Sequence, residues 1–162
     1  FSYRTLFPIV LLIYAIPQIT VLPVFVLTFG IGTASKIAFG ASHGIFPIIL
    51  NVVGGLKAAH PQHMLSARTM GASRIQIVRR VLLPQLVPAL FAGMRVSIAI
   101  TLVGVVLAEL YVSQNGIGYF TQNFSERFDP ADLFGLVAIL AVIAIALSEG
   151  AHRLELHFNR WR

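Results

Sequence analysis

The chain contains no cysteine and has few charged residues. Without a thiol it can form neither a disulfide nor a cysteine-based metal site. Charged residues make up 11% of its 162 residues, whereas soluble proteins average about 25%. Hydrophobic residues make up 57%, and the mean hydropathy is +0.83. A soluble domain of this length could not bury so much apolar surface, so the composition predicts a membrane protein.

Motifs for catalysis and for nucleotide binding are also missing. The sequence has no Gly-x4-Gly-Lys-Ser/Thr phosphate loop, so any ATP would have to be hydrolysed by another chain. His60 and His63 are three residues apart and could share a helix face, but no nearby Cys or acidic residue completes a metal site. The five histidines are scattered and show no triad pattern. We therefore expect no intrinsic enzyme activity, no metal and no cofactor.

Four long apolar runs dominate the chain. They cover about residues 6–29, 37–56, 86–111 and 133–151. The first run is longer than the roughly 20 residues that a spanning helix needs, and Pro8, Pro17 and Pro23 interrupt it, which predicts a kinked span. The last run reaches only a marginal spanning length. Together the runs predict one all-α domain, residues 1–162, folded as a polytopic membrane helical bundle of about four transmembrane helices.

Few polar residues lie within these runs. His43 and Asn51 lie in the second run, among small residues that let helices approach closely. We expect them to form hydrogen bonds between helices, and the alternative is that they line a substrate path. Arg95 lies near the start of the third run, where it can snorkel toward the membrane surface. Glu109 lies near the end of that run, where we expect it to cap a helix or to form an ion pair.

Residues 57–84 form a polar segment between apolar runs, yet apolar residues recur in it at helical spacing. Pro61 suits the first turn of a short helix, and Gly71 can end that helix in the left-handed conformation. Ser73 can then cap a second short helix, in which apolar and basic side chains segregate. Pro84 should bend the chain before the third run. The pattern predicts a docking element of two short helices with a corner between them.

The spacing within this segment resembles a known motif. Ala67, Gly71, nine further residues and Val81-x-Leu83-Pro84 resemble the cytoplasmic loop of binding-protein-dependent ABC importer permeases, whose pattern is EAA-x3-G-x9-I-x-LP. Leu65 stands where that pattern has Glu, and Ser66 stands where it has the first Ala. In that family the loop forms a coupling helix that sits in a cleft of the ATP-binding subunit. The resemblance implies that the ATPase-docking residues are Leu65, Ser66, Ala67, Arg68, Gly71, Leu83 and Pro84.

Further stretches resemble the nitrate, sulfonate and taurine branch of the same family. They are Ile16-Pro17-Gln18, Leu22-Pro23-Val24-Phe25, Phe29-Gly30-Ile31-Gly32, Ser35-Lys36, Ala92-Gly93-Met94-Arg95, Ala108-Glu109 and Gly116-Ile117-Gly118-Tyr119. Together they cover most of the chain from Leu6 to Phe120. The resemblance implies the transmembrane domain of a type I ABC importer. If it holds, we expect the chain to be the last four helices of the usual six-helix subunit.

The resemblance also implies a function and a set of partners. The chain would be a permease subunit that moves a small solute, with ATP hydrolysed on a separate ATP-binding subunit. An extracytoplasmic binding protein would deliver the solute, and two permease copies would pair about a two-fold axis, as a homodimer or with a related permease. No residue identifies the solute.

Two rival functions remain at this point, an ion-coupled secondary transporter or channel and a membrane-embedded assembly protein. An ion-coupled carrier is expected to place ionisable residues near the middle of the bilayer. The apolar runs hold no Asp, Glu or Lys at mid-depth, which favours the ATP-driven importer. An assembly protein would give no reason for two short helices in the polar segment.

The basic residues predict the orientation of the chain. The segment 57–80 holds Lys57, Arg68, Arg74, Arg79 and Arg80, and the C-terminal tail holds Arg153, Arg160 and Arg162. The loops on the other side hold only Lys36 and Arg127. By the positive-inside rule the docking element and the tail are cytoplasmic, which predicts a multi-pass protein of the bacterial inner membrane. Because the basic residues lie at the ends of apolar runs and not in one patch, we expect contact with membrane lipid and not with nucleic acid.

Overall fold

The computed structural model describes residues 2–158 and the side chains of residues 7–156, and this part of the chain is helical with no β-strand. In chain order the elements are α1 (Ser2–Ala15), the 3₁₀ turn η1 (Gln18–Val21), α2 (Leu22–Phe29), α3 (Thr33–Ala58), α4 (Pro61–Thr69), α5 (Arg74–Ile77), the π-helical turn η2 (Val78–Leu82), α6 (Leu83–Val112), α7 (Ile117–Glu126) and α8 (Pro130–Phe158). The predicted all-α fold is confirmed. Two of the expected basic residues of the tail, Arg160 and Arg162, lie outside the described residues.

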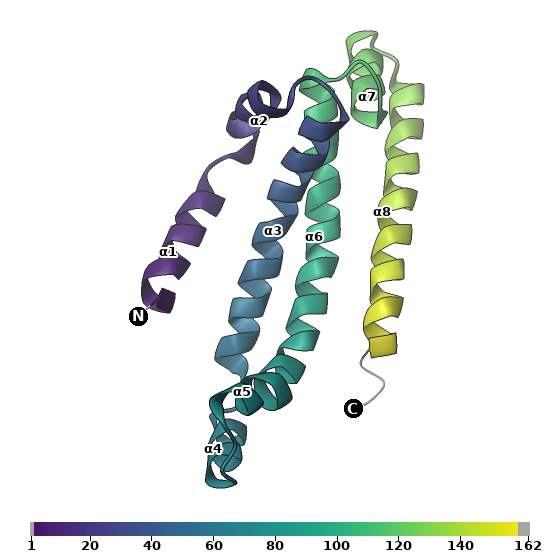
Figure 1. Cartoon of the computed structure of the whole chain (residues 1–162). Coiled ribbons are helices and arrows are strands. Elements are labelled where there is room, and N and C mark those ends of the chain that lie inside the picture. The colour runs from purple at the N-terminus through teal and green to yellow at the C-terminus, as the bar shows by residue number, and fades with distance from the viewer. Residues whose placement is uncertain (1, 159–162) are drawn as a thin grey trace.

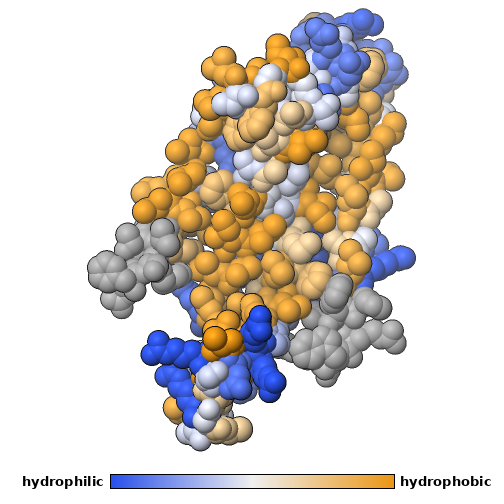
Figure 2. Space-filling model, viewed as in Figure 1, coloured by the Kyte–Doolittle hydropathy of each residue, from blue (hydrophilic) through white to orange (hydrophobic). Residues whose placement is uncertain are grey.

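The centre of the bundle is formed by α3 and α6, which lie side by side, and α8 runs beside α6 (Figure 1). α4 and α5 lie at one end of the bundle, and α2 and α7 lie at the other. Three helical stretches are long and apolar enough to cross a membrane: Thr33–Ala58, Arg74–Val112 and Pro130–Leu156. Apolar residues cover the sides of this body, and hydrophilic residues gather at its two ends (Figure 2).

The first apolar run is not one straight helix. Its two parts, Phe7–Ala15 and Gln18–Phe29, meet at an angle of 84°. The break falls at Ile16 and Pro17, because a proline has no N–H to donate and disfavours the helical conformation of the residue before it. The described residues therefore contain three candidate spans, or four if the bent pair is counted as one span.

Small residues bring α3 and α6 into close contact. A Cβ on Gly44 of α3 would lie 2.2 Å from Oγ1 of Thr101 and 2.5 Å from Oγ of Ser97, both on α6. A Cβ on Gly93 of α6 would lie 2.9 Å from the Cα of Ile48 on α3. These positions leave no room for a larger side chain. Close approach of this kind drives helix association in lipid, where water exclusion between helices contributes little.

Two neighbouring glycines of α3 allow a test of this packing. A Cβ on Gly55 would lie 2.4 Å from the Cβ of Ala89 in α6, whereas a Cβ on Gly54 would meet no atom within 4 Å. We expect Gly55→Leu to push the helices apart and to destabilise the bundle by roughly 1–3 kcal/mol, the usual cost of overpacking. Gly54→Leu is the matched control and should cost less than about 0.5 kcal/mol. Unfolding in detergent micelles, followed by circular dichroism, measures both variants, and equal stabilities would contradict the close contact.

The second short helix of the docking element is not a separate helix. α5 continues through η2 into α6, so that Arg74–Val112 forms one helical stretch. Within it the N–H of Leu83 bonds to the carbonyl of Val78, five residues back. The next residue, Pro84, has no N–H, and a π-helical turn is a usual accommodation of such an interruption. The predicted second helix does begin after Ser73, but it is the start of a long helical stretch and not a short helix.

Candidate docking element and polar clusters

α4 ends in a corner that local hydrogen bonds hold in place. Gly71 has a φ of 78°, which is the left-handed conformation predicted for it. Its N–H donates to the carbonyl of Arg68, and the N–H of Ala72 donates to the carbonyl of Ala67, each at 3.0 Å. This pair of bonds is a Schellman motif. The spacing between Ala67 and Gly71 therefore has a local structural cause, because the two residues occupy fixed positions in that motif.

Ser73 begins the next helix, as predicted. Its Oγ accepts a hydrogen bond from the N–H of Gln76 at 3.3 Å, and Oε1 of Gln76 accepts one from the N–H of Ser73 at 2.8 Å. This reciprocal capping box satisfies two backbone donors at the helix N-terminus. One hydrogen-bonded motif therefore closes the end of α4 and another opens α5, with no unstructured linker between them.

A groove separates α4 from the beginning of α6. The side chains of His63 and Gln85 meet across it, with 3.2 Å between Nδ1 and Nε2. Its volume is about 450 Å³. The other lining residues are Ser66, Ala67, Met70, Arg80, Val81 and Pro84. The groove thus brings together three of the predicted docking residues, which are Ser66, Ala67 and Pro84.

The remaining predicted docking residues lie outside the lining of this groove. Leu65 is 64% exposed on α4, and Arg68 and Gly71 are exposed at the corner. Leu83 is 51% exposed and lines a second, apolar groove beside α6. The structure therefore divides the predicted set between the groove, the corner and the apolar side of α6.

Sequence reasoning did not name Met70, Arg80 and Gln85 among the docking residues, although all three line the groove. Gln85 is a polar residue that directly follows Pro84 and precedes a long apolar stretch. An isolated polar residue in that position was the one available signal for a contact to α4. Nothing in the sequence alone places Met70 and Arg80 on the same groove.

The two predicted pathway residues lie where α3 meets α6. His43 is 8% exposed, its Nδ1 lies 3.1 Å from the carbonyl oxygen of Phe39, and its ring packs against Gly104 of α6. Nδ2 of Asn51 donates to the carbonyl of Pro47 at 2.9 Å. Both hydrogen bonds stay within α3, so the expected hydrogen bonding between helices is not what the described residues show. The lining of a substrate path stays a prediction for both.

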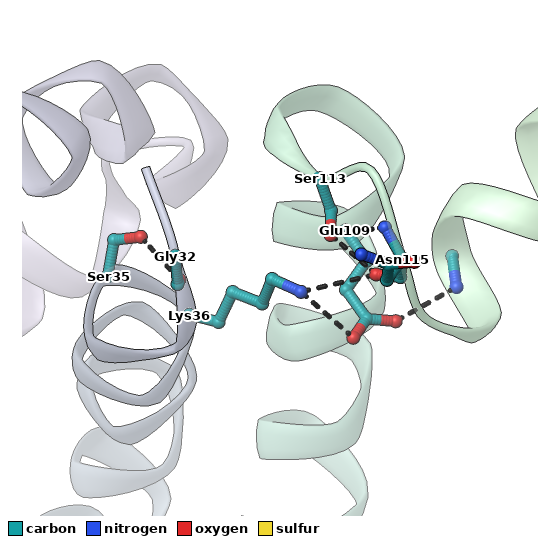
Figure 3. A network of polar contacts seen from close by, with 7 residues as sticks. Gly32, Ser35, Lys36, Glu109, Ser113 and Asn115 are labelled. Atoms are coloured by element: carbon teal, nitrogen blue, oxygen red, sulfur yellow. Dashed lines mark hydrogen bonds and ion pairs between the residues drawn. The ribbon is translucent and has the colours of Figure 1, made fainter. Parts of the chain in front are cut away.

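At the opposite end of the bundle, Glu109 connects three elements (Figure 3). Its Oε1 lies 3.5 Å from Nζ of Lys36 in α3, and its Oε2 accepts a hydrogen bond from the N–H of Gly118 in α7 at 3.0 Å. Lys36 also donates to the carbonyl of Asn115 at 3.2 Å. A carboxylate is stabilised at a helix N-terminus, where backbone N–H groups are unpaired. The expectation that Glu109 caps or pairs is confirmed, and we call Lys36, Glu109, Asn115 and Gly118 the outer clasp.

The helix α7 was not predicted, since the sequence suggested only a loop at that place. Its half-buried or buried residues Ile117, Gly118, Thr121 and Phe124 recur at helical spacing, and this periodicity could have revealed it. Gly118 lies directly against α6, because a Cβ there would be 2.4 Å from the carbonyl oxygen of Val106. A glycine at this position lets the N-terminus of α7 approach Glu109.

Arg95 connects α6 to α8. Its Nη2 forms an ion pair with Oε2 of Glu155 and lies 2.9 Å from Nδ1 of His152, both on α8. The position of Arg95 in the sequence indicates that it can snorkel toward the surface, and this stays a prediction. The two partners join the C-terminal part of α8 to α6.

The described residues thus form a bundle of apolar helices, three or four of which can span a membrane, with α4 and α5 meeting at a hydrogen-bonded corner at one end. This is the architecture of a polytopic membrane protein. The chain belongs to the family described as binding-protein-dependent transport system inner membrane component, whose model matches residues 1–161. The family predicted from the motif spacing is confirmed.

Curated relatives agree with this membership. The chain is 30% identical to the formylaminopyrimidine transport permease protein ThiX of Halalkalibacterium halodurans over 98% of the chain and 64% of that protein. It is 30% identical to the taurine transport system permease protein TauC of Escherichia coli, over 95% of the chain and 56% of that protein. It is 32% identical to the riboflavin transport system permease protein RibX of Chloroflexus aurantiacus, over 98% of the chain and 59% of that protein. The chain therefore spans less than two thirds of the length of these relatives.

Proposed function

We propose that the chain is part of the permease subunit of an ATP-driven ABC importer that moves a small solute across the bacterial inner membrane. The proposal rests mainly on the geometry of the docking corner. Hydrogen-bonded motifs on both sides of Ala72 join α4 to a helical stretch that continues through the body of the bundle. A partner that displaces α4 would therefore displace α6 as well. Membership of the family, and the names of relatives as transport permeases, support the same function.

The proposal includes three protein partners. A separate ATP-binding subunit would hydrolyse ATP and grip α4 through the predicted docking residues. An extracytoplasmic binding protein would deliver the solute at the end of the bundle that carries α2 and α7. A second permease copy would pair with the first about a two-fold axis. The relatives are named for formylaminopyrimidine, taurine and riboflavin, so their names support a small solute without selecting one.

The energy source separates this function from an ion-coupled carrier. The test uses proteoliposomes that contain the permease together with the ATP-binding and solute-binding proteins recovered with it. The probes are labelled taurine, riboflavin, nitrate and formylaminopyrimidine. We expect uptake of one of them to require ATP and to persist after a protonophore has collapsed the proton gradient. Uptake that follows an imposed ion gradient without ATP would refute the importer.

Cysteine labelling tests the proposed orientation, and residues 1–162 contain no cysteine of their own that would take up the label. Met70 at the docking corner is 81% exposed, and Phe128 at the other end is 91% exposed. Because basic residues surround the docking corner, we expect it to be cytoplasmic. An impermeant maleimide should label Phe128→Cys in intact cells whose outer membrane has been permeabilised. It should label Met70→Cys only after the inner membrane is opened, and the reverse pattern would overturn the orientation.

Enlarging Ala67 tests the proposed docking residues. Ala67 lies in the groove beside α4, where a large side chain would fill the space that a partner needs. We expect Ala67→Trp to reduce retention of the ATP-binding subunit by about fivefold or more, because overpacking a close contact costs roughly 1–3 kcal/mol. Gln62→Trp is the control, since Gln62 lies on the same helix, is exposed and does not line the groove. Quantitative co-purification measures both, and equal retention would show that the groove is not part of the interface.

A further inference from the structure

The docking element has basic residues without acidic ones. From Lys57 to Pro84 the sequence contains five Lys or Arg and no Asp or Glu, and the first acidic residue of the whole chain is Glu109. The arginines Arg68, Arg74, Arg79 and Arg80 are exposed, and none of them takes part in an ion pair among the described residues. Each of these side chains is therefore available to pair with an acidic group on another molecule.

Helix stability explains the positions of some of the four arginines but not of all. Arg68 lies in the last turn of α4, where a positive charge is favourable. Arg74 is the first residue of α5, where a positive charge faces the positive end of the helix dipole and is unfavourable. A residue kept at an electrostatic disadvantage within its own helix is expected to gain from an interaction outside it. Arg74 is adjacent to the capping residue Ser73, so this interaction would lie at the docking corner.

Arg79 and Arg80 are consecutive but line different surfaces. Arg80 lines the groove between α4 and α6, together with Ala67 and Met70. Arg79 lines the second groove, whose other residues, among them Val52 and Leu90, are apolar. An arginine beside an apolar helix face at the end of a span is typical of a membrane interface, where its head group reaches the lipid phosphates. Of the two neighbours, only Arg80 therefore lines the groove between α4 and α6.

We propose that the groove between α4 and α6 receives an acidic segment of the ATP-binding subunit. Arg80 in the groove lining, and Arg68 and Arg74, which are exposed at the adjoining corner, would supply the complementary positive charge. This inference rests on the proposed function, because it describes the partner at the same site. Exposed apolar side chains lie near the arginines in sequence, since Leu65, Met70 and Ile75 are 64%, 81% and 70% exposed. A hydrophobic contact with a charged rim is the usual composition of a protein interface. The hydrophilic end of the molecule that carries this surface is visible in Figure 2.

The test compares single neutral substitutions at the four arginines. The permease is reconstituted in nanodiscs of phosphatidylcholine, and binding of the ATP-binding subunit that co-purifies with the parental protein is measured between about 50 and 500 mM NaCl. We expect Arg68→Gln, Arg74→Gln and Arg80→Gln each to weaken binding by about twofold to fivefold at low salt, as loss of a rim charge does. The triple variant should lose at least about tenfold and should bind with little dependence on salt. Arg79→Gln is the matched control and should bind like the parental protein.

The outcomes separate this inference from the proposed function. If Ala67→Trp weakens binding but the three arginine variants do not, the docking site stands and its acidic partner surface is refuted. If all four variants, Arg79→Gln included, lower binding equally, the effect comes from net charge and the inference is also refuted. If the variants bind the ATP-binding subunit normally but lose affinity for nanodiscs or vesicles containing phosphatidylglycerol, the countercharge is lipid. If the parental protein binds no ATP-binding subunit, the proposed function itself fails.

Discussion

Gly71→Val should leave the chain inserted in the membrane and lower ATP-driven uptake by about tenfold or more. The reason is conformational, because Gly71 has a φ of 78° and a Cβ added there would meet no atom within 4 Å. A side chain costs roughly 1–2 kcal/mol in the left-handed conformation, and a β-branched residue is among the least tolerant of it. Valine would therefore open the Schellman motif that fixes the angle between α4 and α5.

Gly71→Asn is the matched control for this prediction. Asparagine adds a side chain of similar size but adopts the left-handed conformation readily, so it should retain most of the uptake. Both variants are compared for membrane insertion, retention of the ATP-binding subunit and solute uptake. Parental uptake by Gly71→Val would show that a fixed corner is not needed. Equal loss in both variants would point to a contact at the glycine surface rather than to the backbone angle.

The docking corner could be predicted from the sequence because its hydrogen bonds join near neighbours. The Schellman motif connects Ala67 to Ala72, and the capping box connects Ser73 to Gln76. Gly71 follows the end of α4 and Ser73 precedes α5. Glycine is preferred after a helix end and serine before a helix start, so these residue types are informative there. The all-α fold was predictable for a similar reason, since long apolar runs in a membrane leave the helix as the main way to satisfy the backbone.

The interactions that arrange the helices could not be predicted in this way. The groove depends on a contact between residues 22 apart, His63 and Gln85, and α8 is fastened by Arg95 and Glu155, which are 60 residues apart. No local pattern encodes which partner a polar side chain meets across a bundle. The helices α3 and α8 also extend beyond the apolar runs 37–56 and 133–151, because a helix can continue through polar residues.

One helical stretch links the two polar ends of the bundle. Arg74–Val112 contains 39 residues, which corresponds to a contour length of about 58 Å at the rise of an α-helix. It begins at the docking corner and carries Glu109 of the outer clasp near its other end. A displacement at the corner would therefore be transmitted to Lys36 of α3 and Gly118 of α7, because both residues contact Glu109. If the outer clasp is stable, that displacement would move α3, α6 and α7 together at the outer end.

Glu109→Ala should destabilise the bundle by roughly 3 kcal/mol, because removing one partner of a buried pair leaves the other without its countercharge. The Glu109 and Lys36 side chains are only 15% and 19% exposed, and the N–H of Gly118 would lose its acceptor as well. Glu109→Gln keeps an acceptor for that N–H and should cost less. Glu126→Ala is the control, since Glu126 is an exposed residue of α7 that accepts a hydrogen bond only from Gln122, and it should cost less than about 0.5 kcal/mol.

The double variant Lys36→Met/Glu109→Leu shows whether the pair acts as a unit. It replaces both charges by apolar groups of similar length, so no charge remains buried without a partner, and it should be more stable than Glu109→Ala by about 1–2 kcal/mol. Denaturant titration of the four variants in micelles gives the free energies of unfolding. If the double variant is as unstable as Glu109→Ala, the orphaned lysine is not the source of the loss. The cost would then arise at the N-terminus of α7, where Glu109→Gln alone would restore stability.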